Sequence, residues 1–319
     1  MRRSRFSRLP GLILALGLLS GCAAPQTTAL LSAPHANLPR QAELTATPSI
    51  AQERYQCGPA ALAMLLRSAG FAVDADALVP QVYLPHREGS LQVEMIAAGR
   101  RNGALSMTIA PRVDALLAEL AAGNPVVILQ NLSLPIVPKW HYAVAIGYDV
   151  ARRDIILRSG TTERLVMPIS TFEHTWARSG YWGMVTLAPG RLPATADETT
   201  VVDALVAFEK SSPPSAARKS YALAAQRWPD NLALALGLGN TAYAAGDKAG
   251  AAAAFQRASD KHPDSGAAAN NLAVALMELG QLKAARAAAE RALALGEPWR
   301  AAAVDTLASI RRAEKSRKR

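Results

Sequence analysis

From about Thr199 onward almost every residue is a good helix former, alanine dominates, and the same small and apolar residues return with a period of 34. One unit is marked by Leu238, Gly239, Tyr243, Ala251, Phe255, Ala258 and Pro263, and the next by Leu272, Leu276, Ala285, Ala289 and Ala292. A pair of helices of this length cannot bury its apolar face alone, so successive units must stack into one continuous core. The pattern therefore predicts an all-α array of helix pairs over 199–319.

This pattern resembles the tetratricopeptide repeat. Two full repeats are expected at about 232–265 and 266–298, with a degenerate repeat before them and a basic capping helix, Trp299–Lys315, after them. The resemblance implies a surface that recruits a protein partner, because stacked repeats form a concave face. A plain bundle of alanine-rich helices would show much of the same pattern and stays open at this point. The segment carries no nucleophile, metal-ligand cluster or phosphate-binding loop.

Between residues 48 and 189 the sequence predicts an α+β domain instead. Apolar residues at helical spacing predict helices over 58–68, 91–101 and 113–122. Alternating or continuous apolar runs predict strands at 126–130, 141–148, 155–158, 165–168 and 181–187. Helices followed by strands in short succession favour N-terminal helices packed on an antiparallel sheet.

The segment from Gln52 to Met64 carries the chemistry. Cys57 stands directly before Gly58-Pro59, at the expected start of a helix, where unpaired amides favour a thiolate and can hold an oxyanion. Gly58 permits the close approach of a substrate carbonyl, and the side-chain amide of Gln52 could be a second oxyanion donor. A nucleophile needs a base, and His141, at the start of an expected strand, is the best candidate.

These motifs carry a second resemblance. Gln52 and Cys57-Gly58-Pro59-Ala60, followed by His141-Tyr142-Ala143-Val144 and Gly147-Tyr148-Asp149, resemble the bacteriocin-processing, double-glycine-leader type of cysteine peptidase, which has a papain-like fold. The resemblance covers about 48–189. It implies Cys57 as nucleophile, His141 as general base and acid, and Gln52 as oxyanion donor. It further implies a polypeptide substrate, peptide-bond hydrolysis and no cofactor.

Two features depart from that family's pattern. Gln52 lies five residues before Cys57, whereas the helper glutamine of papain-like enzymes usually lies six before. The third triad member should face His141 from the next strand, and the length of the hairpin puts that place at 159–161, which reads Ser159-Gly160-Thr161. Ser159 could accept the imidazole N–H weakly, but no carboxylate stands there, so weak or specialised activity is expected. Two alternatives stay open: a catalytically inactive peptidase that binds an extended peptide, and an acyl transferase that uses the same thioester.

The N-terminus reads as a targeting segment. Four arginines precede residue 9, an apolar run covers 9–19, and Leu19-Ser20-Gly21-Cys22 resembles the lipobox of bacterial lipoproteins. The resemblance implies a signal peptide at 1–21 and acylation of Cys22, which would anchor the chain to a membrane of the bacterial cell envelope. Ala23 in place of Asp suggests the outer membrane, facing the periplasm. Residues 22–47, rich in Ala, Pro, Thr, Ser and Gln, are predicted to be a tether.

Charge and cysteine content exclude other classes. The net charge of +10 suggests nucleic acid or a membrane, but the N-terminal arginines and the basic tail 311–319 account for nearly all of it. Because no basic stripe is interleaved with aromatic residues, a nucleic-acid partner is not expected. The two cysteines, Cys22 and Cys57, are too few for a disulfide framework. The histidines other than His141 show no metal-ligand spacing, so no metal site is expected.

Overall fold

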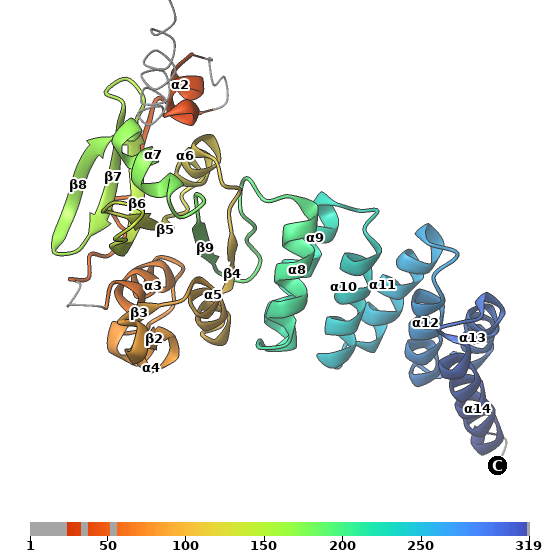
Figure 1. The fold of residues 1–319 in the computed structure, drawn as a ribbon. Coiled ribbons are helices and arrows are strands. Elements are labelled where there is room, and N and C mark those ends of the chain that lie inside the picture. Colours follow the sequence, from red (N-terminus) through yellow and green to blue (C-terminus); the bar gives the residue numbers. More distant parts are fainter. Residues whose placement is uncertain (1–23, 33–37, 52–55, 318–319) are drawn as a thin grey trace, which may run out of the picture.

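The computed structural model describes residues 24–32, 38–51 and 56–317, which form a sheet-containing part and a helical array (Figure 1). The helices of the first part are α2 (Pro25–Ser32), α3 (Cys57–Ser68), α4 (Ala75–Val82), α5 (Gln92–Arg101), α6 (Val113–Ala121) and α7 (Ile169–Ala177). Its strands are β1 (Gln41–Glu43), β2 (Tyr83–Leu84), β3 (Gly89–Ser90), β4 (Leu105–Thr108), β5 (Val126–Asn131), β6 (Trp140–Asp149), β7 (Asp154–Ser159), β8 (Thr162–Pro168) and β9 (Gly183–Leu187). The predicted α+β architecture with an antiparallel sheet is confirmed.

The main sheet has seven strands in the order β4-β9-β5-β6-β7-β8, with β1 added beside the end of β6, and every pairing is antiparallel. Strand β5 is buried along its whole length because helices cover both faces. Val127 and Leu129 pack with α3, α4 and α5, whereas Val126 and Ile128 pack with α6 and α7. This alternation of side chains holds α3 against the middle of the sheet.

The expected helices and strands are present within a few residues of their predicted bounds, but several elements escaped the sequence reading. The pattern did not predict α4, β4 or the small β2–β3 hairpin. The sequence pattern predicted no helix between the strands at 165–168 and 181–187, but Trp176, which stands there in the sequence, lies in α7 and is completely buried. Short elements of this kind contain too few residues to show a period, so only their tertiary packing defines them.

The prediction of a tether over 22–47 is wrong for its described parts. At the start of α2, the backbone amides of Gln26 and Thr27 donate hydrogen bonds to the buried carboxylate of Glu173, at 3.0 and 2.6 Å. Strand β1 pairs with the end of β6, with Ala42 opposite Tyr148. Glu173 caps a helix that lies some 147 residues before it, and no local pattern could reveal such a partner.

The helical array follows as α8 (Glu198–Glu209), α9 (Pro214–Arg227), α10 (Leu232–Ala244), α11 (Lys248–Lys261), α12 (Gly266–Glu278), α13 (Leu282–Leu295) and α14 (Arg300–Arg317). Neighbouring helices pack in sequence, as the repeat pattern predicted (Figure 1). Because Gly239 has no side chain, the ring of Phe255 packs directly against its backbone. A Cβ at residue 239 would lie 2.3 Å from that ring. The expected capping helix is α14.

The array shares a hydrophobic core with the sheet. Buried residues of α8, including Leu205 and Phe208, share one core with Leu105 of the edge strand β4 and Leu187 of its neighbour β9. The buried carboxylate of Glu119 accepts hydrogen bonds from the connecting segment, which therefore runs along a fixed path. Among the described helices, none combines the length and the apolar character that crossing a bilayer requires.

Candidate active site

Cys57 is the first residue of α3, and the fold places its sulfur at the side of β6. The described part of the chain holds this cysteine as a free, partly buried thiol. The backbone amides of Tyr142, Gly58 and Cys57 donate toward the sulfur. Because Tyr142 directly follows His141 on β6, the amide contact brings the expected nucleophile and the expected base to the same point of the fold.

His141 stands near the start of β6, and its ring is held by the neighbouring strand. Its Nε2 lies 2.9 Å from the hydroxyl of Ser159 at the end of β7. The β6–β7 register, in which Val144 lies opposite Arg158, brings the end of β7 alongside the start of β6. Since Ser159 engages Nε2, Nδ1 is the ring nitrogen left to accept a proton from the thiol.

A groove of about 970 Å³ joins these residues. Cys57, His141 and Tyr142 contribute to it, and the segment before α5 and the start of β6 form its sides. Three basic residues, Arg87, Lys139 and Arg178, face it against a single acidic one, Glu88. The walls of the groove come from separate segments of the chain, which leaves the thiol accessible to a substrate that lies between them.

The electrostatics of the pair differ from the sequence expectation. Burial raises the pKa of the Cys57 thiol, and the amides of Tyr142, Gly58 and Cys57 offset only part of this effect. Burial lowers the pKa of His141, and the positive charge of Lys139 lowers it further. At pH 7 the resting site therefore holds a neutral thiol beside a neutral imidazole. The expected preference for thiolate is wrong here because desolvation outweighs the helix N-terminus.

Tyr142 and Ser90 support the start of α3, and the sequence pattern assigned neither of them a role of its own. The hydroxyl of Tyr142 donates to the carbonyl of Ser90 at 3.0 Å, which holds the β2–β3 hairpin against the helix. A Cβ at Gly58 would stand 2.3 Å from Ser90 Oγ, so glycine is required there for packing. This role adds to the one predicted for Gly58, which was close approach of the substrate.

Two predicted site residues fall outside the described part of the chain. Gln52, the expected oxyanion donor, lies in the gap between residues 51 and 56, and Cys22, the expected acylation site, precedes residue 24. Of the described residues, no group of three from His, Cys, Asp and Glu lies close enough together to hold a metal ion.

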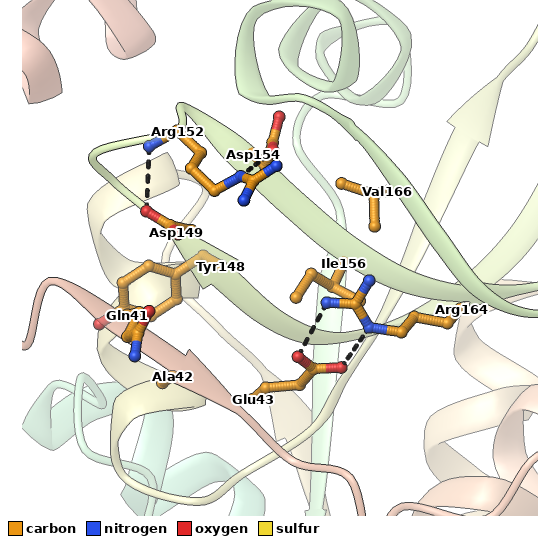
Figure 2. Close-up of a pocket in the computed structure, with 10 residues that line it drawn as sticks. All are labelled: Gln41, Ala42, Glu43, Tyr148, Asp149, Arg152, Asp154, Ile156, Arg164 and Val166. Carbon is orange, nitrogen blue, oxygen red and sulfur yellow. Dashed lines mark hydrogen bonds and ion pairs between the residues drawn. The ribbon is translucent and has the colours of Figure 1, made fainter.

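A second pocket, of about 550 Å³, lies at the other end of β6, between β1 and the β7–β8 hairpin (Figure 2). Its charged groups pair with one another. Arg164 binds both oxygens of Glu43, at 2.7 and 3.0 Å, while the backbone amide of Arg152 donates to Asp149 at 3.0 Å. Because these pairs satisfy the charges and no nucleophile is present among the lining residues, we assign no chemistry to this pocket.

Comparison with known proteins identifies both parts. Residues 38–184 match the model of the Peptidase_C39 like family, and residues 236–299 match a tetratricopeptide repeat model. The chain therefore combines a C39-like peptidase domain with helical repeats of the tetratricopeptide type. No curated protein matches the chain.

Solved structures resemble each part separately. A C39-like peptidase from Bacillus anthracis is 20% identical, covers 47% of this chain and 98% of its own, and gives a TM-score of 0.40. The tetratricopeptide domain of Sgt2 from Aspergillus fumigatus is 20% identical, covers 38% of this chain and 81% of its own, and gives a TM-score of 0.36. The first tetratricopeptide domain of human RPAP3 is 21% identical over 38% of this chain and 94% of its own, again with a TM-score of 0.36.

Proposed function

We propose that this chain is a membrane-anchored cysteine peptidase that hydrolyses peptide bonds with Cys57 and His141. One observation carries the proposal. The amide of Tyr142 contacts the sulfur of Cys57 while the preceding residue, His141, lines the same groove and is oriented by Ser159. A thiol at a helix N-terminus beside an oriented imidazole is the arrangement that acyl transfer through a thioester needs.

The reaction begins from the neutral pair. As the sulfur attacks the peptide carbonyl, Nδ1 of His141 takes the thiol proton and a carbon–sulfur bond forms. The oxyanion is held by the amide of Cys57 and, in this proposal, by the side chain of Gln52. The imidazolium then protonates the leaving amine as the peptide bond breaks. Water hydrolyses the thioester with His141 as base, which releases a carboxylic acid and restores the thiol.

The other two parts of the chain would bring enzyme and substrate together. Acylation of Cys22 would hold the protein at a membrane of the cell envelope, and in our proposal this is the periplasmic face of the outer membrane. The helical array would recruit the polypeptide substrate or a partner protein, since stacked repeats expose an extended concave surface. Both roles rest on the sequence motifs and on the repeat pattern.

The direct test is cleavage of a complex peptide mixture, read by mass spectrometry. The wild-type protein is expected to generate new peptide termini, and Cys57→Ala and His141→Ala are expected to generate none. Ser316→Ala, a change at an exposed serine of α14 that does not line the groove, serves as the control. Cleavage that persists in Cys57→Ala would exclude this cysteine as the nucleophile.

The raised pKa of Cys57 and the neutral hydroxyl of Ser159 that holds His141 favour one alternative, a catalytically inactive peptidase that binds an extended peptide. That protein would bind peptides from the same mixture with equal affinity in wild type and Cys57→Ala and would cleave none. An acyl transferase would instead give products joined to an added amine, which the mass spectra would distinguish from hydrolysis.

A further inference from the structure

The loop between β5 and β6 exposes more large apolar side chains than any other segment in the described part of the chain. The exposed fraction is 61% for Leu134, 85% for Ile136, 67% for Val137 and 50% for Trp140. Leu132 is exposed as well. Several exposed apolar side chains within one short loop of a folded protein indicate a contact site, because leaving them in water is unfavourable.

The loop is built to hold these side chains outward. Asn131 Oδ1 accepts hydrogen bonds from the amides of Ser133 and Lys139, at 3.0 and 2.9 Å, which closes the base of the loop. Its tip is a turn in which the amide of Val137 donates to the carbonyl of Leu134 at 3.1 Å. Pro135 and Pro138 restrict the backbone further. The apolar side chains therefore project from a preformed hairpin, and they do not collapse onto the domain.

Helix α7 links this loop to the start of the described chain. Arg178, at the end of α7, donates to the carbonyls of Asn131 and Ser133, at 3.0 and 2.9 Å. Glu173, five residues earlier, holds the N-terminus of α2, which packs beside α7 (Figure 1). Five helical residues span about 7.5 Å, so the two attachment points are neighbours on one helix.

The proposed acylation site, Cys22, is only a few residues before α2 in the sequence. Cys22 is two residues before Ala24, so two peptide units, at most about 7 Å, separate the proposed acylation site from a residue next to the Glu173 cap. No long tether intervenes, because α2 is packed into the domain. If Cys22 is acylated, the bilayer surface comes close to α7 and hence to the apolar loop.

We infer that the loop 132–140 is a membrane-contact hairpin that inserts Leu134, Ile136 and Val137 into the surface of a phospholipid bilayer with anionic headgroups. Trp140 and Lys139 at its base suit the headgroup layer, where indole and ammonium groups are favoured. Arg87, Lys139 and Arg178, which line the groove beside the loop, add positive charge to this side of the domain, and positive charge favours anionic headgroups. The inference rests on the proposed lipid anchor for orientation, but the insertion belongs to the loop itself.

The insertion also defines the substrate class of the proposed peptidase. Pro138, Lys139 and Trp140 form one wall of the catalytic groove, so a hairpin seated in the bilayer places that groove at the membrane surface. The polypeptide that reaches Cys57 would then be a segment close to the membrane, such as the region beside a spanning helix or another lipid anchor.

The test is flotation with vesicles of phosphatidylethanolamine and phosphatidylglycerol. It uses residues 22–319 with Cys22→Ser, so that no acyl chain contributes to binding. This protein is expected to float with the vesicles, and Ile136→Asp and Val137→Asp are each expected to lower the bound fraction on the order of tenfold. Val304→Asp, the same change at an exposed valine of α14, is the matched control and should bind like the parent protein.

Equal thermal unfolding of the loop variants and the parent protein shows that a loss of flotation reports the loop and not misfolding. No vesicle binding by the parent protein, or equal binding by the loop variants, would overturn the inference. Loop variants that float normally but cleave or bind peptides poorly would also overturn it, because the loop would then be a wall for substrate. Cys57→Ala should float like the parent protein, so failure of the proposed catalysis is distinguishable from failure of membrane contact.

Discussion

Replacing Ser159 by aspartate should shift the neutral pair of Cys57 and His141 toward an ion pair. The serine hydroxyl lies 2.9 Å from Nε2 and offers the imidazole a neutral partner only. A carboxylate in its place would favour the imidazolium, and the imidazolium would in turn favour the Cys57 thiolate. Ser159→Asp therefore supplies the charge that the hairpin lacks at this position.

The size of the effect follows from the geometry. A carboxylate about 4 Å from the imidazolium charge gains roughly 4 kcal/mol at an effective dielectric constant of about 20. Loss of hydration at this partly buried site offsets some of the gain, so a rise in the pKa of His141 of about 1–2 units is expected. That corresponds to about 1.4–2.8 kcal/mol. If about half of this free energy is felt at the thiol, alkylation of Cys57 at pH 7 becomes roughly three- to tenfold faster.

The assay is the rate of iodoacetamide alkylation of Cys57 as a function of pH. Thr161→Asp, which adds the same charge to the exposed turn two residues away, is the control and should leave the rate nearly unchanged. Ser159→Ala should have little effect on the alkylation rate, because it removes only a neutral partner. Equal rates in Ser159→Asp and Thr161→Asp would refute the reasoning, since they would show that His141 does not act on the thiol.

Three further predictions concern the site and its support. In the wild type, burial raises the pKa of Cys57, so the thiolate fraction at pH 7 is small and alkylation should accelerate with pH until above about pH 8.5. Gly58→Ala should cost about 1–3 kcal/mol of stability, because the new methyl group would meet Ser90, and denaturant unfolding measures this cost. Glu173→Ala should destabilise the protein by about 3 kcal/mol, because the buried amide and hydroxyl of Thr27 lose their acceptor; thermal unfolding and proteolysis of α2 measure it.

Control variants separate these effects from a nonspecific loss of stability. Adding Ser90→Gly to Gly58→Ala should restore most of the lost stability, because it removes the clashing side chain. Glu163→Ala, on the exposed strand β8, should be nearly neutral where Glu173→Ala is not. An alkylation midpoint below pH 7 in the wild type would contradict the neutral resting pair.

The order of elements could largely be predicted because its signals are local. A 34-residue period and a shift to alanine define the helical array, and one thiol before Gly-Pro at a helix start defines the candidate nucleophile. Even the place of Ser159 followed from the length of the β6–β7 hairpin, because antiparallel pairing ties position along one strand to position along the next.

Only the tertiary structure decided how these parts act on one another. It turned the expected tether into a packed helix and strand, because Glu173 and β6 supply partners from more than a hundred residues away. It also set the charge state of the site, since burial of Cys57 depends on what covers α3 and not on the residues beside it. The chain thus specified its elements and its nucleophile through periodicity and short motifs, which act over a few residues. Packing between distant segments determined the protonation of Cys57, the hydrogen bonds of Glu173 to the N-terminus of α2, and the exposure of the loop 132–140. Burial and buried hydrogen bonds exist only once the chain has folded.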